Sequence, residues 1–214
     1  MDDNASVVPY YPEGRKLYKS SRQLEAIRRA RATEAEEVPH QSLDEVRRII
    51  DSIPRERNRL LVQLLFDGCL RVSEALGVRP CDIQQSPSGW VVRIMGKGRR
   101  PGVAAISPSL GAALLAYCYQ QGVALEARIF PVTRGRVHQI VSDAMRRAGV
   151  AKPRGVGAVH VLRHSGAIER LARTGNPKAV QTQLRHRSAL MTLRYLKTLT
   201  AREGLEVQKG VELW

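Results

Sequence analysis

Six basic and hydroxyl side chains stand at positions where they could act together on an anionic substrate: Arg71, Lys97, His160, Arg163, His186 and Tyr195. The spacing of His160 and Arg163 is i, i+3, which places them on one face of an expected helix. His186, between two arginines, could be one of several contacts to a phosphate. Taken singly, each pattern has a simpler structural explanation, such as a solvated turn for Lys97 or an amphipathic helix for Tyr195. The prediction therefore rests on the combination.

The charge of the chain favours a polyanionic partner. Its 214 residues carry a formal net charge of +15, a balance typical of proteins that bind nucleic acid. The excess is concentrated in residues 144–200, where twelve basic side chains accompany a single acidic one, Glu169. A genome rich in arginine codons is an alternative explanation for the many arginines, but it explains this clustering less well.

The composition argues against several other classes of protein. No apolar run approaches the ~18 residues that span a membrane, and the N-terminus lacks the basic and apolar stretches of a secretory signal. The three cysteines (Cys69, Cys81 and Cys118) show no C-x-x-C spacing, which disfavours a disulfide scaffold or a zinc module and favours a reducing cytoplasm. We expect no metal, no cofactor and no membrane partner.

The periodicity of apolar residues changes along the chain and predicts a mostly α protein with a small antiparallel β-sheet (α+β). Ser42 and Glu45 form a capping-box pattern at the start of one helix, and Pro54 ends it. A basic, glycine-rich turn separates two β-like runs. The expected strands are 90–94 and 102–106, and the expected helices are 21–37, 43–53, 59–66, one near 72–73, 109–119, 134–148, 159–173, one from Pro177 and 189–199.

The ordered set of residues resembles the tyrosine recombinase (phage integrase, Xer-like) family over roughly residues 40–200. The segment Leu70–Leu76, with Arg71 and Glu74, resembles its first arginine motif, and Gly96-Lys97-Gly98 resembles its hairpin lysine. The segment His160–Ser165, with His160 and Arg163, closely resembles its H-x-x-R box. Leu184–Ser188, followed by Tyr195, is similar to its terminal box.

The resemblance implies a chemistry for each residue. Tyr195 would attack a DNA phosphodiester and form a 3′-phosphotyrosyl link, which stores the bond energy for rejoining. Arg71 and Arg163 would neutralise the phosphate oxygens, and Lys97 would protonate the leaving 5′-oxygen. His160 would assist as acid, base or phosphate ligand, and His186 would hydrogen-bond the phosphate. Glu74 would orient Arg71 or the hairpin; a plain helix-end carboxylate is the alternative for it. The residues expected to bind DNA are Arg99, Arg100, Arg185, Arg187 and Arg194.

This sequence departs from the family pattern at several points. Arg185 and Cys69 stand where the family usually or often has Gly, and the strand after Lys97 runs Arg99-Arg100-Pro101-Gly102. Arg99 or Arg100 could therefore share the role of Lys97. His164, four residues after His160, is expected to be structural.

Three segments are expected: an N-terminal extension with one polar helix (1–40), a catalytic domain (41–200) and a C-terminal tail (201–214). Only about forty residues precede the catalytic region, where the family usually has a core-binding domain. In relatives a C-terminal segment docks on a neighbouring protomer; packing in cis or disorder are alternatives for this tail.

The leading hypothesis is a site-specific recombinase that acts on double-stranded DNA as a tetramer of protomers joined through the C-terminal segment. Two alternatives stay open: a non-catalytic DNA-binding accessory protein with the same fold, and a DNA-relaxing enzyme of the type IB topoisomerase kind. The sequence leaves the target site undefined, as well as the choice between integration, excision and resolution.

Overall fold

The computed structural model describes residues 38–96, 100–186, 188, 189 and 191–199. The expected helix over 21–37 and the tail from residue 201 lie outside the described residues. Within the described part, no helix is long and apolar enough to cross a membrane.

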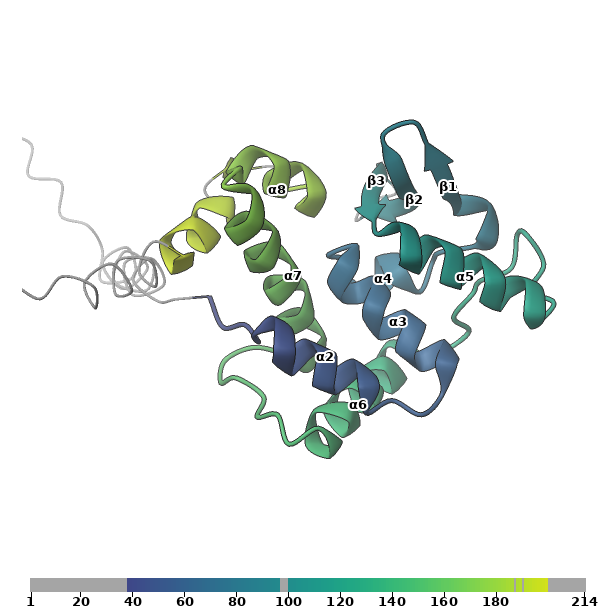
Figure 1. Ribbon diagram of the computed structural model, residues 1–214, viewed down its shortest axis with the longest axis horizontal. Helices are drawn as coiled ribbons and strands as arrows, with labels where there is room; N and C mark the ends of the chain where they lie inside the picture. Colours follow the sequence, from purple (N-terminus) through teal and green to yellow (C-terminus); the bar gives the residue numbers. More distant parts are fainter. Residues whose placement is uncertain (1–37, 97–99, 187, 190, 200–214) are drawn as a thin grey trace, which may run out of the picture. The chain divides into compact units, whose positions relative to one another are not determined.

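The described residues form a mostly helical fold with a small antiparallel sheet, as the sequence predicts. The elements are α2 (Leu43–Asp51), α3 (Glu56–Asp67), α4 (Val72–Ala75), a 3₁₀ turn η1 (Pro80–Asp82), β1 (Ile83–Ser86), β2 (Gly89–Gly96), β3 (Arg100–Ile106), α5 (Pro108–Gln120), α6 (Arg134–Arg147), α7 (Ala158–Thr174) and α8 (Pro177–Leu184). The sheet has three strands and lies at one side of the helices, next to α4 and α5 (Figure 1). A further helical segment covers residues 191–199.

Local sequence signals account for most helix ends. The Ser42 hydroxyl accepts a hydrogen bond from the Glu45 amide, while the Glu45 carboxylate accepts one from the Ser42 amide, so the predicted capping box is confirmed. At the start of α6 the Thr133 hydroxyl accepts a hydrogen bond from the Arg136 amide. Gly175 ends α7 with φ of 59°, a left-handed conformation that glycine adopts without steric cost.

One strand was not predicted from the sequence. β1 pairs with β2 from Ile83 opposite Val92 to Ser86 opposite Gly89. Its sequence, Ile-Gln-Gln-Ser, contains a single apolar residue, because an edge strand needs to bury little on either face. The period-2 pattern that indicates a strand is therefore missing.

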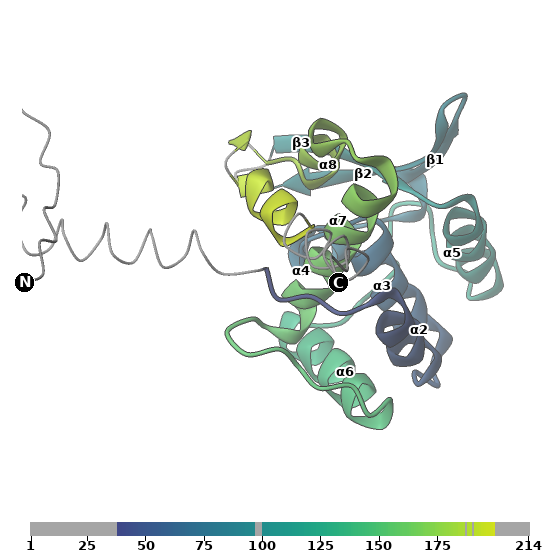
Figure 2. The ribbon, with the colours of Figure 1, turned by 60° about the vertical axis from the view of Figure 1, so that its left-hand side comes forward.

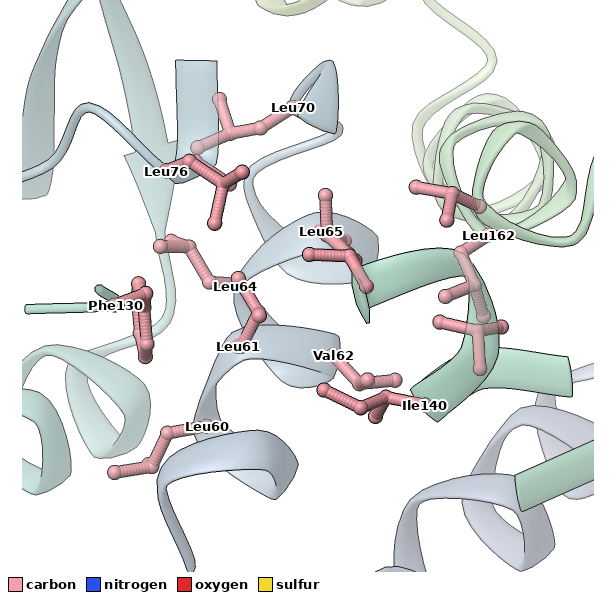
Figure 3. Packing of buried hydrophobic residues seen from close by; sticks show 14 of the residues in the cluster. Leu60, Leu61, Val62, Leu64, Leu65, Leu70, Leu76, Phe130, Ile140 and Leu162 are labelled. Carbon is pink, nitrogen blue, oxygen red and sulfur yellow. The ribbon is translucent and has the colours of Figure 1, made fainter. Parts of the chain in front are cut away.

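Helix α3 forms the centre of the core. Leu61, Val62, Leu64 and Leu65 are almost completely buried, because α3 packs against α2, α5 and α7 on different sides. Figure 3 shows Leu64 beside Phe130 and Val62 beside Ile140. A helix covered on several sides must be apolar around most of its circumference, and this packing fixes the end of α3, from which the first arginine motif leaves.

A second apolar cluster holds the C-terminal segment. It comprises Val38, Cys69, Ala167, Ile168, Leu171, Val180, Leu184, Tyr195 and Leu199. The chain before α2 also contributes a polar contact, because the Val38 amide donates to the Thr198 hydroxyl at 2.9 Å. Tyr195 is thus fixed by packing against α7 and α8, which lie side by side in Figures 1 and 2.

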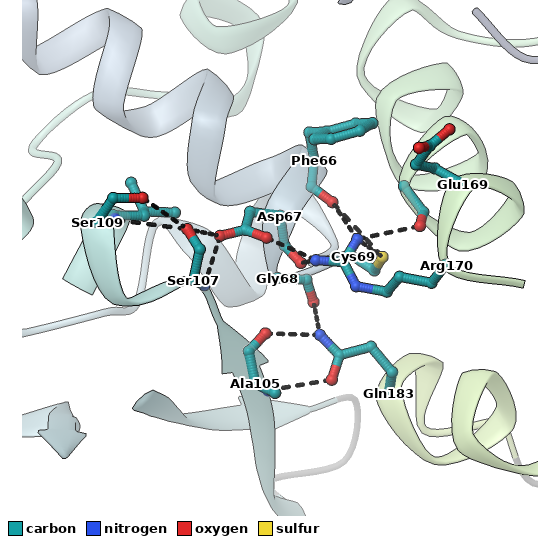
Figure 4. A network of polar contacts seen from close by, with 12 residues as sticks. Phe66, Asp67, Gly68, Cys69, Ala105, Ser107, Ser109, Glu169, Arg170 and Gln183 are labelled. Atoms are coloured by element: carbon teal, nitrogen blue, oxygen red, sulfur yellow. Dashed lines mark hydrogen bonds and ion pairs between the residues drawn. The ribbon is translucent and has the colours of Figure 1, made fainter. Parts of the chain in front are cut away.

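A polar network ties the end of α3 to α7, α8 and the start of α5 (Figure 4). Asp67 accepts hydrogen bonds from the amide and hydroxyl of Ser107, both at 2.7 Å, and forms an ion pair with Arg170 at 2.6 Å. The Gln183 side-chain oxygen accepts a hydrogen bond from the Ala105 amide in β3, and its nitrogen donates to the carbonyls of Ala105 and Gly68. These bonds set the relative position of elements that are distant in the sequence.

Candidate functional site

The first arginine motif lies in the loop between α3 and α4. Cys69 has φ of 48°, which lets the chain reverse direction at the end of α3. Arg71 is the N-cap residue of α4, and its side chain is 36% exposed. The side chain is therefore partly open to solvent although its Nη1 is held by Glu74.

The Glu74 carboxylate is the charge at the centre of the site. Its side chain is 2% exposed, and Oε1 accepts from Arg71 Nη1 at 2.8 Å. Oε2 accepts from the Arg71 amide and from Arg185 Nη2, both at 2.8 Å, and lies 3.8 Å from Arg163 Nη1. Burial opposes ionisation of Glu74, but Arg185 and the hydrogen bonds from Arg71 outweigh it, so the pKa of Glu74 lies below its ordinary value. The guanidiniums of Arg71, Arg163 and Arg185 thus all lie within 4 Å of one carboxylate.

Arg163 is held from inside the protein. It is 3% exposed, and its guanidinium donates to the carbonyls of Cys69 and Leu184. Burial, together with the charge of Arg71, lowers the pKa of Arg163 to about 10, so the group stays charged at neutral pH. The guanidiniums of Arg71 and Arg163, which come from distant motifs, therefore lie around the same Glu74 carboxylate.

Tyr195 lies against α7. It is 4% exposed, and its hydroxyl is 2.8 Å from His164 Nδ1. The His186 ring stacks with the Tyr195 ring, with centroids 6.2 Å apart and an interplanar angle of 18°. Burial raises the pKa of Tyr195 to about 12, although the charge of Arg163 partly offsets this. The phenol is therefore protonated at neutral pH.

His164 and His186, the two imidazoles in contact with Tyr195, are neutral at pH 7. Burial and then the neighbouring His160 lower the pKa of His164 to about 4, and burial and then Arg163 do the same for His186. His186 is oriented by the Thr192 hydroxyl, 3.1 Å from its Nδ1. His160 is exposed on α7, with its pKa also lowered by burial of part of the ring and by Arg163. A neutral imidazole has one ring nitrogen that donates a hydrogen bond and one that accepts.

The other predicted contact residues are placed differently. Lys97, Arg99 and Arg187 lie outside the described residues. Arg100 and Arg194 are exposed, as a contact to DNA requires. Arg185 instead points inward, with 16% of its side chain exposed and its guanidinium on Glu74.

Sequence reasoning gave His164 a structural role and did not connect it with Tyr195. The two residues are 31 positions apart, and their contact depends on packing between α7 and the 191–199 segment. The i, i+4 spacing of His160 and His164 was a usable signal, because it places both rings on one face of α7; their centroids are 5.9 Å apart.

A family model, the phage integrase family, matches residues 42–202. The chain belongs to this family. Among curated relatives, the tyrosine recombinase XerD of Corynebacterium glutamicum is 30% identical over 187 residues, covering 79% of this chain and 60% of that protein. XerC of a Methylobacterium species is 33% identical over 154 residues, covering 68% of this chain and 47% of that protein.

Solved structures of phage integrase family members share the fold. The XerH recombinase in a post-cleavage complex with its difH substrate has a TM-score of 0.69 at 21% identity, covering 82% of this chain and 54% of that one. The catalytic domain of the bacteriophage HP1 integrase has a TM-score of 0.60 at 21% identity, covering 76% and 89%. The predicted fold class is confirmed. The chain spans about half to three fifths of the length of the first curated relatives it matches.

Proposed function

We propose that this chain cuts and rejoins double-stranded DNA through a covalent 3′-phosphotyrosyl intermediate on Tyr195, as a site-specific recombinase. The observation that carries the proposal is the arrangement around Glu74: Arg71 and Arg163 meet on one buried carboxylate, while the charge of Arg163 also reaches the Tyr195 phenol. A phosphate placed beside the partly exposed Arg71 would meet cationic groups from two distant parts of the chain.

The proposed reaction is a transesterification that balances without a cofactor. The Tyr195 oxygen forms a bond to phosphorus as the bond to the 5′-oxygen breaks, and the phenol proton is released. Lys97 is the proposed donor of the proton that the leaving 5′-oxygen takes up. A 5′-hydroxyl then attacks the phosphotyrosyl bond and restores Tyr195. Arg71 and Arg163 would stabilise the charge of the pentacoordinate transition state, with His160 and His186 as further phosphate contacts.

The proposed partner is duplex DNA. The net positive charge and the exposed Arg100 and Arg194 support it. Several solved relatives are complexes with DNA, including the XerH complex with difH and the Tn1549 integrase with transposon end DNA. Exchange between two duplexes requires four strand cleavages, so we propose a tetramer on DNA, joined through residues 201–214. The remaining parts of this proposal are a cytoplasmic location and an N-terminal extension ending near residue 40.

A covalent-trapping experiment tests the proposal. The protein is incubated with a pool of nicked duplexes that carry randomised arms, so that a cleaved strand loses its 5′-hydroxyl end and cannot be rejoined. Protein–DNA adducts that survive denaturation in SDS are isolated and sequenced. We expect adducts with the wild type, enriched in one sequence, and none with Tyr195→Phe. Adducts that persist in Tyr195→Phe, or none in either protein while DNA binding is intact, would overturn the proposal; the second result would favour a DNA-binding accessory role.

A further inference from the structure

Arg185 occupies a backbone position that is costly for any residue except glycine. Its φ is 55°, and among the described non-glycine residues only Cys69 shares a positive φ. A side chain in this conformation is strained because Cβ approaches the following carbonyl. The Nε of Arg185 is also buried, with no hydrogen-bond partner among the described residues. Local strain of this kind concentrates at functional sites, so the arginine needs an explanation.

The contacts of Arg185 provide one. Its Nη2 donates to Glu74 Oε2 at 2.8 Å, and its Nη1 donates to the Gln183 carbonyl at 2.6 Å. Glu74 Oε2 is the same atom that accepts from the Arg71 amide, while Oε1 holds the Arg71 guanidinium. Arg185 therefore fixes the carboxylate on which both the backbone and the side chain of Arg71 depend.

The stem of Arg185 lies against the β2–β3 hairpin. A Cβ on Gly102 would be 3.0 Å from Arg185 Cδ, so β3 approaches this stem as closely as a glycine permits. On β2, a Cβ on Gly96 would be 4.0 Å from Glu74 Oε1. Gly96 and Gly102 thus bring both strands close to the Glu74–Arg185 pair.

We propose that Arg185 is a positioning residue: it locks the Glu74 carboxylate that orients Arg71, and its stem seats the β2–β3 hairpin at Gly102. The inference rests on the proposed function in that Arg71 is taken to bind the reacting phosphate. It replaces the expectation that Arg185 contacts DNA, because both terminal nitrogens of Arg185 already have acceptors inside the protein.

The first test substitutes Arg185→Gly, which removes the side chain and with it the steric strain at the positive φ. Hydrogen exchange of the Arg71 amide, followed by NMR, reports whether Glu74 still holds it. We expect this exchange to be at least about tenfold faster in the variant, because the accepting Glu74 oxygen is no longer held by Arg185. Arg185→Lys, which retains the charge but not the fork, should give an intermediate rate. Arg146→Ala removes an exposed charge elsewhere and should leave the rate unchanged.

The second measurement separates positioning from DNA contact. With the trapped sequence as substrate, Arg185→Gly should lower the rate of adduct formation from bound complex about tenfold. The slope of log K for DNA binding against log salt should stay that of the wild type, whereas loss of a phosphate contact would reduce it by about 0.9. A reduced slope with an unchanged cleavage rate would overturn the proposal, as would unchanged exchange at Arg71. If the wild type forms no adduct, the proposed function fails, and Arg71 exchange alone decides the role of Arg185.

A pair of substitutions tests the contact with the hairpin. Gly102→Ala should slow adduct formation and speed exchange at Arg71 in the wild type, because the new methyl group displaces the Arg185 stem. In the Arg185→Gly background the next atom that this methyl meets is Ile94 Cγ1 at 3.7 Å, an ordinary contact, so Gly102→Ala should then have no further effect. Equal effects of Gly102→Ala in the two backgrounds would contradict the proposed contact between the Arg185 stem and Gly102.

Discussion

The hydroxyl of Tyr195 lies 2.8 Å from Nδ1 of His164, on the same helix that carries Arg163. The hydrogen bond gives the buried phenol oxygen a polar partner and restrains where the hydroxyl lies. Because His164 is neutral at pH 7, its ring can exchange the roles of donor and acceptor with the phenol. The position of the proposed nucleophile therefore depends on His164, for which the sequence predicts only a structural role.

Replacement of His164 should slow DNA cleavage without weakening DNA binding. In His164→Leu the Tyr195 hydroxyl loses its partner, and a hydrogen bond worth about 1 kcal/mol corresponds to a roughly five- to tenfold slower single-turnover rate. In His164→Asn the amide can occupy the place of Nδ1, so most of the rate should remain. Equal rates for His164→Leu and the wild type, measured on bound complex, would show that the contact does not position the nucleophile.

Stability should fall as the pH decreases from about 6.5 to 4. Burial lowers the pKa of His164 and of His186 to about 4 in the folded protein, whereas in the unfolded chain both take up protons near 6.5. The unfolded state thus binds more protons in this window, and the free energy of unfolding decreases with acidification. Urea unfolding between pH 7 and 4.5 measures the effect, and His164→Asn should make the decline shallower. A pH-independent midpoint over this range would contradict the buried neutral imidazoles.

Much of the fold followed from local signals in the sequence. The Ser42–Glu45 capping box, the Thr133 cap and the glycine after α7 act within a few residues, so they can be read directly. β1 could not be predicted in this way, since its pairing with β2, not its own pattern, makes it a strand. Its residues Gln84 and Gln85 are exposed and polar, so they show no alternation of apolar and polar residues that would indicate a strand.

The site was predictable in its parts but not in its arrangement. Motif spacing identified Arg71, Arg163 and Tyr195, whereas their meeting depends on how α7 packs against the end of α3. The two noted departures from the family's glycines have a structural meaning: Cys69 and Arg185 both have positive φ. The sequence showed that a glycine was missing at each position, but not which contacts compensate for it.

The ion pair between Asp67 and Arg170 should contribute far more to stability than an exposed pair of the same length. Both the Asp67–Arg170 and Asp143–Arg146 pairs are 2.6 Å long, but the side chains are 20% and 27% exposed in the first and 41% and 78% in the second. Asp67 also accepts two bonds from Ser107. We expect Asp67→Ala to cost about 2–3 kcal/mol and Asp143→Ala less than about 1 kcal/mol. Urea midpoints compare them, and equal losses would contradict a structural role for this network.

The closest approach of α7 to the end of α3 depends on Gly166. A Cβ at this position would lie 2.2 Å from the Phe66 carbonyl oxygen, a backbone atom that cannot rotate away. Gly166→Ala must therefore push α7 from α3 and disturb the loop that leads to Arg71, at a cost of about 3 kcal/mol. Gly135→Ala is the matched control, because its nearest atom would be 4.0 Å away and alanine favours the helix by up to about 1 kcal/mol. We expect a lower urea midpoint for Gly166→Ala and an unchanged or higher one for Gly135→Ala. If both variants shift in the same direction by the same amount, α7 and α3 are not in close contact at Gly166.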